Sequence, residues 1–126
     1  MTDTVAFEIP GKLDTNHRVR AAVVGGKVRT YKASGYRAGL VHIRLHAAEA
    51  FAATRGWSLL WRYTVRIVTH EPDRRSRDLD NAVKPILDAL TGIAWADDSR
   101  VDCILVVRGD VRRDAPCTVV EVRGCS

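Results

Sequence analysis

The stretch RDLDNAVKPILDAL, residues 77–90, has two aspartates one residue apart just before an apolar pattern. Residues i and i+2 of an extended segment point to the same side, so the carboxylates of Asp78 and Asp80 can converge on one point. Lys84 follows Asp80 by four residues, and in a helix this spacing places two side chains on one face. Such carboxylates can bind a divalent cation, and the lysine can offer a point charge to a phosphate oxygen.

A second pair of aspartates, Asp97 and Asp98, lies in WADDSR, in a loop just before an expected strand. In a compact domain this loop can fold back beside the first pair, and three hard oxygen ligands with waters suit Mg²⁺ or Mn²⁺. Arg74, Arg75 and Arg77 precede the first pair and can hold neighbouring phosphates. This combination fits the hydrolysis of a phosphodiester, in which metal ions neutralise charge and activate water.

Each part of the pattern also has a structural explanation. Asp-x-Asp before a helix is a common N-cap that compensates the helix dipole. Asp97-Asp98 alone is an ordinary turn, and Lys84 alone is an i+4 partner for Asp80, worth about 0.3–0.5 kcal/mol. Because these explanations require three separate coincidences, we favour a metal site.

Charge is divided unevenly along the chain, whose net charge is +5. From Thr15 to Ala48 there is no acid, while seven Lys and Arg residues, Lys27 among them, lie in that part. A basic surface attracts polyanions because neutralised phosphates release counterions. The alternative is a basic face that is merely solvated.

Apolar periodicity predicts an α+β domain over residues 1–126, with two main helices packed on a mixed β-sheet. Pro85 is tolerated only in a first helical turn, so the second helix is expected to begin near Asn81 or Ala82. Strands are expected over 5–9, 59–70, 101–109 and 117–124, a hairpin around Gly25-Gly26 within 23–31, and helices over 34–55 and 81–91.

Several classes of protein are not expected from this sequence. No apolar run approaches the roughly 20 residues of a membrane span, and no secretory signal is evident, so the cytoplasm is the expected compartment. Three cysteines without C-x-x-C spacing indicate neither a disulfide framework nor a zinc site, and Cys103 is expected to be buried in its strand. His42 and His46 have the spacing of a zinc helix, but Ile43 stands where a metalloprotease has glutamate, which favours a basic helical face.

Three segments together resemble the RusA family of Holliday junction resolvases, which are small Mg²⁺-dependent endonucleases, mostly of phages and prophages. They are PDRRSRDLDN (72–81), VKPILDAL (83–90) and WADDSRV (95–101). More loosely, TNHR (15–18) and the basic stretch after it resemble the DNA-contacting N-terminal segment of that family.

The resemblance implies a RusA-like homodimer that uses Mg²⁺, with Mn²⁺ as a substitute, to resolve four-way DNA junctions by paired symmetric nicks. A two-fold dimer presents two equivalent sites for two opposed cuts. The resemblance assigns metal binding to Asp78, Asp80 and Asp98 and an important catalytic role to Lys84. The expected DNA contacts are Thr15, Asn16, His17, Arg18, Lys27, Arg74, Arg75, Arg77 and Asn81.

Two other functions remain open at this point. The fold could clamp branched DNA without cutting it, with the acids serving only as caps. It could also be a related nuclease that acts on flaps or forks. All of these functions predict binding that weakens steeply with salt.

Overall fold

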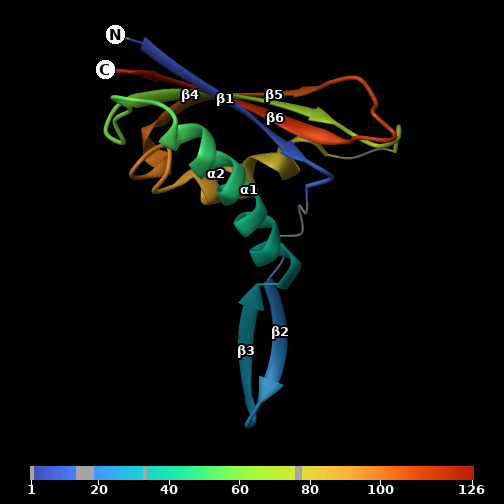
Figure 1. Ribbon diagram of the computed structural model, residues 1–126. Coiled ribbons are helices and arrows are strands. Elements are labelled where there is room, and N and C mark those ends of the chain that lie inside the picture. Colours follow the sequence, from blue (N-terminus) through green and yellow to red (C-terminus); the bar gives the residue numbers. More distant parts are fainter. Residues whose placement is uncertain (1, 14–18, 33, 76–77) are drawn as a thin grey trace.

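The computed structural model describes residues 2–13, 19–32, 34–75 and 78–126 (Figure 1). The expected DNA contacts at 15–18 and Arg77 therefore lie outside the described residues. The elements are β1 (Thr2–Pro10), β2 (Val19–Val24), β3 (Lys27–Lys32), α1 (Ser34–Ala52), β4 (Arg62–His70), the 3-10 helix η1 (Leu79–Ala82), α2 (Val83–Leu90), the 3-10 helix η2 (Asp98–Arg100), β5 (Val101–Arg108) and β6 (Cys117–Cys125).

Four strands form one sheet in the order β1-β6-β4-β5. β4 and β5 run parallel, whereas β1–β6 and β4–β6 are antiparallel, so the sheet is mixed. Figure 1 shows α1 and α2 on the same side of this sheet. The predicted α+β architecture, with two main helices on a mixed sheet, is confirmed.

The core lies between the sheet and the two helices. The strand predicted over 59–70 is present as β4, which alternates with Tyr63, Val65 and Ile67 buried on the helical side. The helix predicted over 34–55 is present as α1, which buries Ile43 and Ala47 against the sheet. None of the helices in the parts that the structure describes is both long enough and apolar enough to cross a membrane.

Aromatic side chains fix the segment that follows α2 against β4. Trp95 is fully buried, and its ring centroid lies 5.6 Å from that of Tyr63. The indole N–H of Trp57 donates to the Ala94 carbonyl at 2.8 Å, and that of Trp95 donates to the Thr91 hydroxyl at 3.2 Å. These contacts position the loop that carries the second aspartate pair.

The predicted hairpin is present as β2 and β3, which pair antiparallel around Gly25-Gly26. Both glycines have positive φ, 58° and 77°, as a two-residue turn matched to the strand twist requires. In Figure 1 the hairpin extends away from the sheet beyond the start of α1. It forms a separate two-stranded sheet.

The expected burial of Cys103 is wrong, because this cysteine is exposed. β5 is an edge strand with β4 as its one neighbour in the sheet. Cys103 pairs with exposed Thr64, on the face of the sheet that the helices do not cover. Ile104 and Leu105 of the same strand are also exposed, at 36% and 52%.

We expect Gly124→Ala to lower the free energy of unfolding by about 1–3 kcal/mol, as other overpacked cores do. A Cβ at Gly124 would lie 2.6 Å from the six-membered ring of Trp61 and 3.1 Å from that of Trp57. Urea unfolding followed by tryptophan fluorescence measures the change. Thr4→Ala, at an exposed position of the same sheet, is the control and is expected to stay within about 0.5 kcal/mol.

Candidate active site

The first acid pair lies where the chain passes from a loop into helix. Asp78 is extended, with φ −78° and ψ 126°, but Asp80 is already inside η1. The expectation that both carboxylates project from one extended segment is therefore wrong. The α-helix begins at Val83, slightly later than expected, and Pro85 falls in its first turn, where its missing N–H costs nothing.

A hollow beside α2 gathers most of the predicted catalytic residues. It is lined by Asp80, Asn81, Lys84, Leu87, Asp88 and Asp98, and is called the α2 hollow below. Its cavity volume is about 390 Å³. The informative member is Asp98, which is fourteen residues beyond Lys84 in the sequence and yet lines the same hollow as Asp80 and Lys84.

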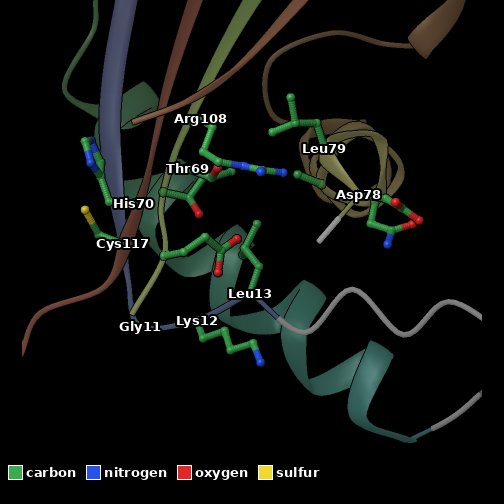
Figure 2. A pocket seen from close by; sticks show the side chains of 13 residues that line it. Gly11, Lys12, Leu13, Thr69, His70, Asp78, Leu79, Arg108 and Cys117 are labelled. Atoms are coloured by element: carbon green, nitrogen blue, oxygen red, sulfur yellow. The ribbon is translucent and has the colours of Figure 1, made fainter. Parts of the chain in front are cut away.

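Asp78 lines a neighbouring pocket at the end of β4, shown in Figure 2. This β4-end pocket is defined by Lys12, Thr69, Glu71, Asp78, Asn81 and Arg108. Asn81 lines both hollows, so the two are adjacent. Among the described residues, no group of three or more His, Cys, Asp or Glu side chains is arranged to hold a metal ion. Joint coordination by Asp78, Asp80 and Asp98 therefore stays a prediction.

The second acid pair divides into two roles. Asp97 precedes η2, and its carboxylate accepts the backbone N–H of Ser99 at 2.8 Å. This bond lowers the pKa of Asp97, because it favours the charged carboxylate. Asp98 instead lines the α2 hollow. Asp97 therefore stabilises a turn, as the structural explanation of this pair expected. The carboxylate of Asp98 can still serve as a metal ligand in the α2 hollow.

Lys84 pairs with a residue that the sequence analysis did not single out. Its Nζ lies 3.2 Å from Asp88 Oδ2, so its i+4 partner follows it rather than precedes it. Asp88 also accepts a hydrogen bond from the hydroxyl of Tyr36, which is 1% exposed on α1. The i+4 spacing of Lys84 and Asp88 was the available signal.

α1 also holds the end of α2 through its backbone. The guanidinium of Arg44 donates to the carbonyls of Ala89 and Asp88, at 3.2 and 3.3 Å. Two independent contacts, one through Tyr36 and one through Arg44, thus fix the helix turn that carries Asp88. This arrangement holds the partner of Lys84 on a rigid support.

A family model described as "Endodeoxyribonuclease RusA" matches residues 10–123, which include both hollows. The chain belongs to the RusA family. It is 48% identical over 50 residues to the crossover junction endodeoxyribonuclease RusA of Escherichia coli strain K12, covering 39% of this chain and 42% of that protein. The same figures hold for the protein of Enterobacteria phage 82, and that of phage HK97 is 43% identical over 49 residues, covering 38% and 41%. The match spans about two fifths of the length of these curated relatives.

The α2 hollow of this RusA-family chain has a donor set suited to a hard divalent cation. Asp80 and Asp98 offer exposed carboxylates, and Asn81 offers an amide oxygen. Mg²⁺ prefers such oxygen ligands and keeps several waters, so a few protein ligands suffice. The residues present therefore fit the ion that the family resemblance implies.

The two histidines of α1 do not form a zinc site with a third ligand among the residues described. Their rings meet edge to face, with centroids 4.9 Å apart. His42 Nε2 lies 2.8 Å from the Pro10 carbonyl, which ties α1 to the end of β1. This geometry indicates a structural role for His42.

Some of the expected DNA contacts are placed by the structure. Arg74 and Arg75 are exposed in the loop after β4, where the Arg75 side chain is 82% exposed and lies 3.9 Å from Asp73. Asn81 lies between the two hollows. Lys27 begins β3, in the hairpin that extends from the sheet. The exposed arginines of this RusA-family protein thus lie three and four residues before Asp78 in the sequence.

We expect the RusA-family chain to lose stability above about pH 10, the pKa of an ordinary tyrosine. Burial raises the pKa of Tyr36, as does its hydrogen bond to Asp88, and burial also raises the pKa of Tyr63. Both folded pKa values lie above the unfolded one, so this stability is complete below pH 10 and falls as pH rises past it. Urea unfolding at pH 8–10.5 measures the trend. Tyr36→Phe should weaken the pH dependence, and an equal dependence in this variant would contradict the assignment.

Proposed function

We propose that this protein is a Mg²⁺-dependent endodeoxyribonuclease that resolves Holliday junctions by paired symmetric nicks. The observation that carries the proposal is the meeting of Asp80, Lys84 and Asp98 in one hollow. Membership of the RusA family supports the reaction class. The relatives' name, crossover junction endodeoxyribonuclease, supports a four-way junction as the substrate.

In this proposal Asp80 and Asp98 hold the cation, with Asp78 contributing from the adjacent pocket. A bound Mg²⁺, or Mn²⁺ in its place, supplies Lewis-acid chemistry that neutralises phosphate charge and activates water. Lys84 donates to an oxygen of the phosphate under attack, and Asp88 orients its ammonium group. Tyr36 in turn anchors Asp88 from α1.

The basic segments around the site hold the DNA backbone in this proposal. Arg74 and Arg75, which are exposed and shortly precede the first acid pair in the sequence, contact phosphates without reading the base sequence. Thr15, Asn16, His17, Arg18, Lys27, Arg77 and Asn81 complete the proposed DNA-contacting set. The net charge of +5 supports such binding.

We propose a homodimer as the working form, because two opposed cuts call for two equivalent sites. Val41 and Leu45 of α1 support this assembly, since they are 68% and 66% exposed and stand four residues apart on one helix face. The β2–β3 hairpin also supports it, because an isolated two-stranded hairpin is at best marginally stable in water. Contacts with a second copy of the chain or with the DNA would stabilise the hairpin.

A labelled four-way junction incubated with the protein and Mg²⁺ tests the proposal. Symmetric nicks in two opposed strands are expected with Mg²⁺, and none with EDTA. Flaps, forks and linear duplexes of the same sequence serve as matched substrates. Tight junction binding that is never followed by cleavage would instead make the protein a binding module, and faster cutting of flaps or forks would reassign the substrate.

A further inference from the structure

The β4-end pocket offers a second binding site beside the proposed catalytic one. It lies at the end of the sheet, where β4 and β5 finish, β6 starts and the chain leaves β1. The start of η1 forms another wall. Its cavity volume of about 350 Å³ is within the range of about 300–1,000 Å³ that is typical of small-molecule sites.

The lining of this pocket mixes hydrogen-bond donors with acceptors. Lys12 and Arg108 bring positive charge, whereas Glu71 and Asp78 bring carboxylates. A free phosphate would meet two carboxylates, and a metal ion would meet an ammonium and a guanidinium. A neutral polar group that carries both donors and acceptors on its edge can pair with both kinds of side chain. A nucleobase is such a group.

Thr69 gives an independent indication of a ligand. It is 7% exposed, and its hydroxyl has no hydrogen-bond partner within the described residues. A buried polar group without a partner is costly, and a ligand that reaches it recovers that cost. Figure 2 shows Thr69 beside Arg108, whose side chain extends from β5 toward Leu79 and Asp78 on the opposite wall.

The pocket also adjoins the proposed place of the scissile phosphate. Asn81 lines both the pocket and the α2 hollow, and Asp78 belongs to the same short segment as Asp80. Glu71 leads into the loop that carries Arg74 and Arg75. DNA bound along η1 and this loop would pass the mouth of the pocket.

We propose that the β4-end pocket accepts one unstacked nucleobase of the strand being cut. Glu71 accepts hydrogen bonds from an exocyclic amino group of that base, and Arg108 donates to a neighbouring ring or keto acceptor. Unstacking a base costs free energy, which its hydrogen bonds in the pocket would offset. This inference rests on the proposed function, since the DNA must lie in the α2 hollow.

The test uses binding without cleavage. Asp80→Asn protein is mixed with junctions that carry 2-aminopurine, a fluorescent base with an exocyclic amino group, at successive positions near the crossover. Fluorescence is expected to rise several-fold at one position, where the base leaves the stack. Glu71→Leu and Arg108→Met, each added to Asp80→Asn, should abolish the rise. The matched control changes, Glu121→Leu and Arg123→Met, lie on strand β6 outside the pocket and should keep it.

A second measurement does not depend on the folding of any variant. Wild-type protein is given junctions with an abasic nucleotide at the position where 2-aminopurine fluorescence rose. The single-turnover rate of cleavage of that strand is expected to fall at least tenfold. Uniform fluorescence at all positions, while anisotropy shows the DNA bound, would overturn the inference even if the protein cuts junctions. Failure of the wild type to cut any branched DNA would overturn the proposed function instead, and the fluorescence assay does not depend on cutting.

Discussion

Asp80→Asn protein is expected to bind a four-way junction as tightly as the wild type but to cut it roughly 10³-fold more slowly, because metal-ion stabilisation is worth several kcal/mol. Asp80 lines the α2 hollow with Asp98, and an amide there cannot replace the charge that holds a cation. Asp98→Asn should behave in the same way. Single-turnover cleavage in Mg²⁺ and anisotropy in EDTA measure the two quantities separately.

Asp102→Asn is the matched control for these variants. It removes another exposed acid, whose carboxylate pairs with Arg62 across β4 and β5, outside the α2 hollow. Its cleavage rate should equal that of the wild type. If Asp80→Asn also cut at the wild-type rate, the acid would be a helix-start residue only, and the metal site would have to be abandoned.

Lys84→Met is expected to slow cleavage roughly 10²-fold, because a hydrogen bond to a charged group contributes about 1.5–3 kcal/mol. Asp88→Asn should slow it about tenfold, as loss of an orienting partner commonly does. The asparagine can still accept the Tyr36 hydroxyl, so the helix contact is kept while the charge beside Lys84 is lost. Single-turnover rates at saturating protein measure the chemical step.

The double variant Lys84→Met, Asp88→Asn decides whether the two residues act together. If Asp88 works through Lys84, the double variant should cut within about twofold of Lys84→Met alone, because coupled residues are not additive. Independent effects would instead multiply to roughly 10³-fold. Melting temperatures of all three proteins separate a loss of folding from a loss of rate.

The secondary structure was largely predictable because its signals are local. Alternation in β4 and the four- and three-residue spacing in α1 reflect burial on one face, and each is present in a few consecutive residues. Gly25-Gly26 predicted the hairpin turn for the same reason. The exposure of Cys103 was not predictable in this way, since it depends on the place of β5 at the edge of the sheet, which the order of the strands decides.

The candidate site was predictable in composition but not in geometry. Residue types and spacing indicated Asp80, Lys84 and Asp98, which share a hollow. They could not show that the 3-10 helix η1 begins between Asp78 and Asp80, because the same residues are compatible with a 3-10 turn and with an extended segment. The β4-end pocket was missed altogether, since it joins the ends of four strands that are far apart in the sequence.

Asp80, Lys84, Asp88 and Asp98 all belong to η1, α2 and η2, which succeed one another along the chain. The reacting groups can therefore be inherited as one uninterrupted stretch of a gene. A single exchange of that stretch between related genes would transfer the whole set at once, because every described residue that lines the α2 hollow lies within 80–98.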